Sequence, residues 1–166
     1  MGTLIVVDGD KVEGTDTHNV SGPGTQVSSG SPAPYTGIAR YDYNGAMTDK
    51  LSAFVSIDGR AVAVKTSQSS LNPGENAAPS GAHSGPMGSS FVPPETSPIA
   101  ATLPALQITD PVGIGVPNSS AGSAFVKIDG VAVLLDGDSI DTCDGLSTPA
   151  NSTVTAEQQD FVSCSA

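Results

Sequence analysis

Two stretches of the chain repeat nearly the same order of apolar and polar residues. Ser52–Lys65 reads SAFVSIDGRAVAVK, and Ser123–Asp136 reads SAFVKIDGVAVLLD. In each stretch an apolar, β-branched run leads into Asp-Gly, and a second apolar run follows it. Asp-Gly between such runs is a strong hairpin signal, because a type I′ turn needs positive φ at both of its central residues. The pattern therefore predicts tight β-hairpins at Ala53–Lys65 and Ala124–Leu135.

A weaker third copy stands near the start of the chain, where Leu4–Val12 reads LIVVDGDKV. Aligning its Asp-Gly pair with the pairs of the other copies places Val7 over Ile57 and Ile128, and predicts a first hairpin over Thr3–Val12. Internal repeats of this kind usually dictate the architecture. Three related hairpins predict three similar faces arranged about one axis. The alternative is that the hairpins are unrelated, since many all-β proteins contain several Asp-Gly turns.

The segments between the hairpins are polar and rich in turn-forming residues. Glu13–Gly37 predicts a loop with at most one short strand, and Asn44-Gly45 predicts the turn of a fourth hairpin. Leu106–Thr109 has enough apolar content to predict a further strand. Near the end, a capping-box pattern predicts a short helix that starts at Thr155.

The length of the chain and its composition favour one small all-β domain over residues 1–166. With 4% aromatic residues and no Trp, the chain has too few large apolar side chains for a thick core, whereas 19 Gly and 13 Pro suit short strands and long loops. The stretch at about 67–98 is dominated by Ser, Gly, Pro and Asn and predicts a long polar loop insertion. A loop of that length is normally functional or disordered.

Charge and motif content exclude several classes of function. A net charge of −11 argues against nucleic acid or an anionic membrane as a partner. No apolar run is long enough to span a bilayer, and the start lacks the features of a signal peptide, so we expect synthesis in the cytoplasm. The chain has no G-x-S-x-G elbow and no recognisable nucleophile motif beside a histidine. We therefore do not expect an enzyme.

The chain contains only two histidines and two cysteines, the residues that most often bind transition metals: His18, His83, Cys143 and Cys164. The first three each follow one of the repeats, so hairpins arranged about an axis would send them toward the same end, and the tail would supply Cys164. Two imidazoles and two thiolates make a closed tetrahedral set that suits a structural Zn²⁺. Such a site would stabilise a thin core. The alternative is a disulfide between Cys143 and Cys164, which a reducing compartment disfavours.

Carboxylate-rich turns offer a different interpretation. The segments DGDKVEGTD and DGDSIDTCDG carry alternating acidic residues at Asp8, Asp10, Asp136 and Asp138. They lack the glycine and the terminal glutamate of an EF-hand loop. A calcium-binding adhesin or structural β-protein is therefore the alternative function.

Val126–Cys143, VKIDGVAVLLDGDSIDTC, resembles the repeated element V-x-I-N-G-x-P-A-A-R-x-G-D, followed by Cys, of the PAAR-repeat proteins. Gly14–Gly22, GTDTHNVSG, is similar to the early Asp-x-x-His-Gly segment of that family. The resemblance implies that His18 and Cys143 bind zinc, with His83 in GAHSG as a second histidine ligand. The P-A-A-R tetrapeptide is absent and only two histidines exist, so Cys164 is inferred as the replacement ligand.

PAAR-repeat proteins are the pointed tips of type VI secretion systems, extracellular contractile injection systems and phage-like tails. The resemblance implies a small conical domain of three pseudo-threefold related hairpins, with long loops converging on a metal-bound apex. It implies a structural role in which one tip caps a trimeric β-helical spike, sharpens it for piercing an envelope, and can carry an effector as cargo. The protein would belong to an assembled injection particle that delivers it outside the cell. In this picture Phe54, Ile57, Phe125 and Ile128 pack inside the cone or over the core of the shaft.

Overall fold

The computed structural model describes residues 2–71, 99–100, 106–109, 113–143 and 148–165, and in these residues it is all-β, as the sequence predicts. None of these residues forms a helix that is long and apolar enough to cross a membrane. The strands are β1 (Thr3–Leu4), β2 (Lys11–Gln26), β3 (Pro32–Asp49), β4 (Ser56–Ile57), β5 (Arg60–Ala61), β6 (Gln68–Leu71), β7 (Ile99–Ala100), β8 (Gln107–Ile108), β9 (Ile114–Pro117), β10 (Lys127–Ile128), β11 (Val131–Ala132), β12 (Ser139–Thr142), β13 (Ser152–Thr155) and β14 (Ser163–Cys164).

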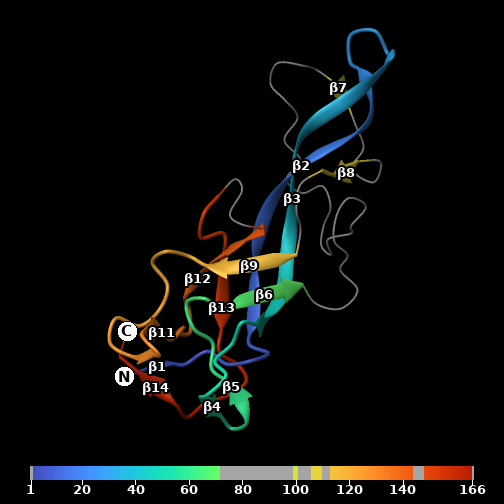
Figure 1. Ribbon diagram of the computed structural model, residues 1–166. Coiled ribbons are helices and arrows are strands. Elements are labelled where there is room, and N and C mark those ends of the chain that lie inside the picture. Colours follow the sequence, from blue (N-terminus) through green and yellow to red (C-terminus); the bar gives the residue numbers. More distant parts are fainter. Residues whose placement is uncertain (1, 72–98, 101–105, 110–112, 144–147, 166) are drawn as a thin grey trace.

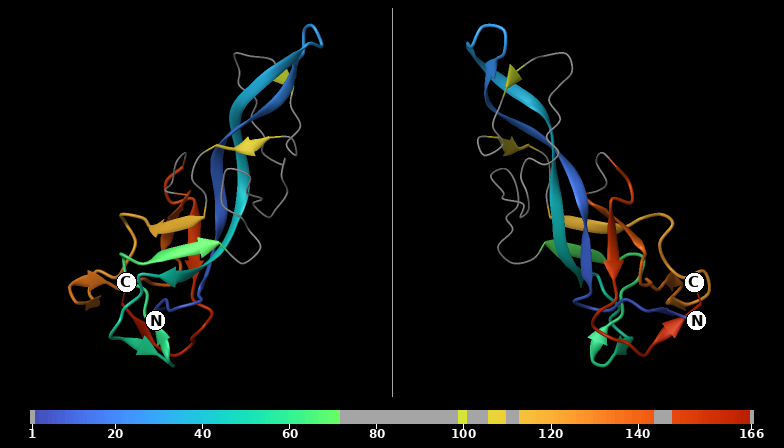
Figure 2. Two further views of the ribbon diagram at one scale, coloured as in Figure 1. Left: turned by 45° about the vertical axis from the view of Figure 1, so that its right-hand side comes forward. Right: turned by 180° about the vertical axis from the view of Figure 1, so that it is seen from behind.

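The molecule has three parts along its length. At one end lies a base of three short two-stranded hairpins, β4–β5, β10–β11 and β1–β14 (Figure 1). A barrel lies next to this base. From the far side of the barrel, a long ribbon formed by β2 and β3 extends away from the base. Figure 2 shows from two further sides that both chain ends lie at the base, opposite the tip of the ribbon.

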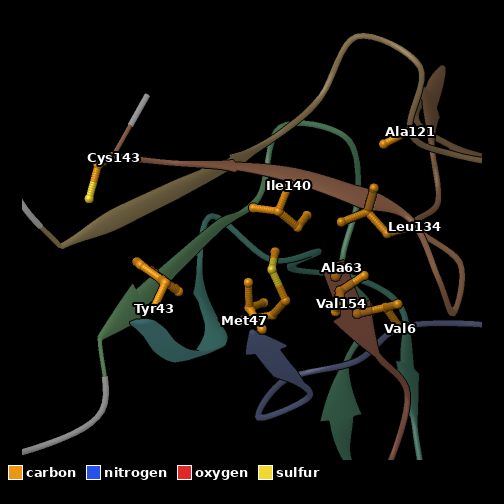
Figure 3. Close-up of a cluster of buried hydrophobic side chains, with 10 residues drawn as sticks. Val6, Tyr43, Met47, Ala63, Ala121, Leu134, Ile140, Cys143 and Val154 are labelled. Atoms are coloured by element: carbon orange, nitrogen blue, oxygen red, sulfur yellow. The ribbon is translucent and has the colours of Figure 1, made fainter. Parts of the chain in front are cut away.

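Six antiparallel strands form the closed barrel. Their order is β13-β12-β9-β6-β3-β2, and β13 also pairs with β2, which closes the ring. A barrel leaves no free sheet edge between these strands. Its interior is filled by one cluster of buried side chains (Figure 3): Val6, Val12, Tyr43, Met47, Ala63, Ala121, Leu134, Ile140, Cys143 and Val154.

Several predictions for the barrel segments are wrong. Asn44-Gly45 is not a turn but lies inside β3, paired with β2 through Glu13 and Val12. The glycine serves close packing, since a Cβ at Gly45 would collide with the backbone of β6. No helix begins at Thr155, which is the last residue of β13. The strand predicted within Leu106–Thr109 is confirmed as β8.

The ribbon occupies most of the segment that was predicted as a loop. β2 and β3 pair continuously from Lys11↔Ala46 to Thr25↔Pro32. The prediction failed because the buried positions on β2 include Asp16 and His18, which give no apolar alternation. The start of the predicted loop at about 67–98 is also a strand, β6, and residues 72–98 lie outside the described part of the chain.

Hydrogen bonds at the floor of the barrel run in a closed three-membered cycle. The backbone N–H of Ala63 donates to the carbonyl of Val6 at 2.9 Å, that of Leu134 to Ala63 at 3.0 Å, and that of Val6 to Leu134 at 3.0 Å. The flanking residues pair in the same cyclic order through three antiparallel bridges: Val7↔Val62, Val64↔Val133 and Ile5↔Leu135. Each of three chain segments thus contacts the next in the same register. This is a pseudo-threefold axis formed within one chain.

Strand alternation divides the side chains of this ring between two cores. The central residues Val6, Ala63 and Leu134 belong to the barrel core. The flanking residues point the other way and form a second cluster in the base, made of Ile5, Val7, Ile57, Val62, Val64, Val133 and Leu135. The ring therefore seals the barrel on one side and supports the hairpins on the other.

Two of the base hairpins have the predicted turns. Asp58 and Gly59 have φ of 51° and 78°, and Asp129 and Gly130 have φ of 49° and 80°, as type I′ turns require. The predicted hairpin over Thr3–Val12 is wrong.

The third hairpin is instead assembled from the two ends of the chain, because β1 pairs with β14. In the ring, Asp8-Gly9 is equivalent to Lys65-Thr66 and Asp136-Gly137, and not to the other hairpin turns. The predicted alignment, which placed Asp8 over Asp58 and Asp129, was therefore wrong by seven residues in both comparisons.

The tail segment that supplies β14 makes the same capping hydrogen bonds as the two other hairpins. The backbone N–H groups of Phe54 and Val55 donate to the Ser52 hydroxyl at 3.3 and 3.1 Å. Ser123 accepts the same two bonds in the third copy, and Gln159 Oε1 accepts them from Phe161 and Val162 at 3.2 and 2.8 Å in the tail. The shared Phe-Val pair in QDFVSC is the sequence signal for the missing half of the hairpin.

Replacing Gly59 or Gly130 by alanine should lower the free energy of unfolding by about 1–2 kcal/mol, because a Cβ is strained at positive φ. Neither site has an atom within 4 Å of the new Cβ, so backbone strain alone is measured. Asp58→Asn is the control, since Asn tolerates this conformation. Urea unfolding measures the change. An unchanged midpoint in the alanine variants would show that the type I′ turns do not form.

Candidate metal centre

Three buried side chains with metal-ligating atoms meet where the ribbon leaves the barrel. Asp16 and His18 on β2 are 1% and 0% exposed, and Cys143, just after β12, is 3% exposed. One ligand atom from each lies within 4.8 Å of the others. No other group of three or more such residues occurs in the part of the chain that the structure describes.

The fold positions these residues through simple strand geometry. Asp16 and His18 are two residues apart on β2, so their side chains point to the same face. β2 pairs with β13 only through Lys11–Gly14, which places the two residues just beyond the barrel rim. β12 pairs with β13 and β9 and delivers Cys143 to the same rim. Figure 3 shows Cys143 and Val6 at opposite ends of the barrel core, so the centre lies at the end away from the base.

The Asp16 carboxylate stands between the other two groups. Its Oδ2 accepts a hydrogen bond from the Cys143 thiol at 2.7 Å and lies 3.4 Å from His18 Nε2. The imidazole also meets the ring of Tyr41 edge to face, with 5.7 Å between the centroids. The three groups are therefore buried together and in contact.

Cys143 has an unusual backbone conformation. Its φ is 51°, in the left-handed region that non-glycine residues rarely adopt. Such a conformation costs about 1–2 kcal/mol for a residue with a side chain, and it concentrates at functional sites. In this chain it accompanies a sulfur atom in contact with Asp16.

The set of one carboxylate oxygen, one imidazole nitrogen and one sulfur suits a transition metal such as Zn²⁺. Metal binding requires the thiol of Cys143 to lose its proton, and the resulting thiolate would repel the Asp16 carboxylate. A divalent cation between the two groups removes that repulsion. Ca²⁺ takes an all-oxygen set, so this centre does not suit it.

The structure brings together two of the four ligands predicted from the sequence, His18 and Cys143. His83 lies outside the described residues. Cys164 does not join the centre: it lies in β14, paired with Thr3, with its Sγ 3.9 Å from the Ser123 hydroxyl. The physical reason is that β14 completes the third hairpin, in which Cys164 occupies the apolar position of Ile57 and Ile128.

Sequence reasoning missed Asp16. The signal was its spacing of two from His18, which identifies a shared face only if the segment is a strand. The alternative of a Cys143–Cys164 disulfide does not hold, because neither cysteine forms a disulfide bond.

Within the described residues, the acidic turns do not bring three or more ligand residues into one group. Asp10 is buried and accepts backbone N–H groups from Val7, Glu157 and Gln158. Asp138 accepts those of Leu135 and Gly122. These carboxylates hold turns and tail together.

No family model, no curated protein and no solved structure matches the chain. The function must therefore be argued from the base and the metal centre.

Proposed function

We propose that the chain is a structural cap whose base sits on the end of a partner with threefold symmetry. The closed cycle of hydrogen bonds through Val6, Ala63 and Leu134 is the observation that carries this proposal. A homotrimer presents three copies of every contact about its axis, and a single chain matches all three only if its own face repeats three times. The base does so even at the cost of building its third hairpin from both chain ends.

The partner class follows from the sheets of the base. The end of a β-helical shaft exposes backbone N–H and C=O groups that must be covered. Short strands arranged about the same axis can continue the shaft by strand addition. We therefore propose a PAAR-like tip on the trimeric β-helical spike of a contractile injection machine, one tip per trimer, within an assembled particle. Cargo carried at the ribbon end is compatible with this orientation.

The opposite end has a complementary role in this proposal. A Zn²⁺ bound by Asp16, His18 and Cys143 ties β2 to the end of β12 where the ribbon leaves the barrel. It supplies cross-linking rather than chemistry, and no step of catalysis is assigned to it. A rigid junction at that point transmits force from base to ribbon, as a piercing tip requires.

Native mass spectrometry tests the proposal. The purified chain is mixed with the trimeric β-helical spike protein of the organism that encodes it. We expect a complex of one chain with three spike protomers, even with the chain in excess. Three chains per trimer, or no complex, would contradict a threefold cap.

A further inference from the structure

The base carries three exposed phenylalanines at equivalent positions. Phe54, Phe125 and Phe161 have 87%, 74% and 64% of their surface exposed. The chain has only four phenylalanines, so three of the four occupy these sites. Large aromatic side chains exposed in this way mark interaction surfaces more often than structural need.

Backbone contacts establish that the three positions are equivalent. Each phenylalanine N–H donates to the side-chain oxygen of the residue two before it, which is Ser52, Ser123 or Gln159. The valine that follows each phenylalanine accepts a hydrogen bond from the matching ring residue, Val62, Val133 or Ile5, at 3.0–3.1 Å. The three aromatic residues are thus fixed at corresponding places about the pseudo-threefold axis.

Four apolar residues of the hairpins were expected to pack inside the cone or over the shaft core: Phe54, Ile57, Phe125 and Ile128. The first option holds for the two isoleucines and is wrong for the two phenylalanines. Ile57 is buried in the base core and Ile128 packs against it, whereas Phe54 and Phe125 point outward. The phenylalanine that matters equally, Phe161, lies in the tail and was not singled out from the sequence.

We infer that Phe54, Phe125 and Phe161 are the anchors of the docking surface, each inserting into one of three identical apolar pockets around the axis of a homotrimer. This inference rests on the proposed function and deepens it. A partner without a threefold axis would leave at least one aromatic side chain in water. Rigid aromatic anchors held by capping bonds lose little entropy on binding, which is typical of interface hot spots.

The experiment uses F54S, F125S, F161S, the triple variant, and V27S as a matched control. Val27 is 67% exposed and lies in the turn of the ribbon, at the other end of the molecule. Affinity for the immobilised spike trimer is measured at fixed salt, and thermal unfolding checks that every variant folds. We expect each single base variant to bind about tenfold more weakly or worse, the triple variant about a thousandfold, and V27S unchanged.

The outcomes separate the inference from the proposed function. Wild-type binding at one chain per trimer with unaffected phenylalanine variants would overturn the inference and leave the cap standing. Weaker binding of only one phenylalanine variant would overturn docking through three equivalent phenylalanines. A wild-type chain that does not bind the trimer would overturn both. If the wild type self-associates and the triple variant does not, the three phenylalanines bind a second copy of the chain, and the inference is overturned.

Discussion

Replacing Cys143 by serine should abolish the proposed zinc binding and lower the melting temperature by about 8–16 °C. A metal present at a thousand times its dissociation constant stabilises the folded state by about 4 kcal/mol. For a chain of this length each kcal/mol corresponds to about 2–4 °C. Cys143 offers the only sulfur atom of the buried candidate centre, and serine is a poor substitute for a thiolate. Elemental analysis and thermal unfolding measure the two effects.

Cys164→Ser is the matched control, because it removes the other thiol from a hairpin position away from the centre. It should retain the metal and lose little stability. A chelator should lower the melting temperature of the wild type to that of Cys143→Ser, and should not change the latter further. Equal metal loss in both cysteine variants, or no effect of the chelator, would contradict the centre. The metal content of the His83→Ala variant tests the remaining sequence prediction, that His83 is a ligand. A loss of metal would support it.

Replacing Asp10 by alanine should lower the free energy of unfolding by about 3 kcal/mol or more. Its carboxylate accepts backbone N–H groups from Val7 at 2.6 Å, Glu157 at 2.7 Å and Gln158 at 2.8 Å. Each buried donor left without an acceptor costs about 1–3 kcal/mol. The same carboxylate also holds the tail that supplies β14, so its loss weakens the third hairpin. Urea unfolding at constant pH measures the effect.

The equivalent positions in the other two repeats give an internal scale. Asp138 accepts two backbone N–H groups, and Ser67 accepts one, from Val64. Alanine at the three sites should therefore destabilise in the order Asp10, Asp138, Ser67. Asp8→Ala, in the same turn as Asp10, should cost little. A loss at Asp8 as large as that at Asp10 would contradict this assignment of the hydrogen bonds.

The sequence predicted the repeat better than the architecture around it. Asp-Gly at Asp58 and Asp129 predicts local turns that need no tertiary partner, and both form as expected. The first copy was misaligned because each repeat has two places where Asp-Gly can stand. Asp8-Gly9 was aligned with the turn at Asp129-Gly130, but it is equivalent to Asp136-Gly137. We had also assumed that each hairpin is continuous in sequence. The true partner of β1 comes from the other end of the chain, where only the short Phe-Val match in QDFVSC indicates it.

The barrel and ribbon were missed for a different reason. β2 and β3 are polar, and the barrel interior draws isolated residues such as Tyr43, Met47 and Ile140 from strands far apart in sequence. Alternation of apolar side chains is therefore weak in every one of these segments.

The candidate site was predicted in part. His18 and Cys143 could be proposed because the chain has so few residues of their kind, and the structure brings them together. Asp16 could not be singled out among many carboxylates without knowing that its segment is a strand. Cys164 was assigned to the site by elimination, and the hairpin position it fills shows why elimination failed.

An electron cryomicroscopy reconstruction of the chain with the proposed trimeric spike, calculated without imposed symmetry, would show directly whether the base caps the trimer axis. We expect one chain on the trimer axis, with the ring of Val6, Ala63 and Leu134 centred on that axis and the ribbon pointing away from the shaft. A chain bound to the side of the trimer, or with its ribbon against the shaft, would contradict it.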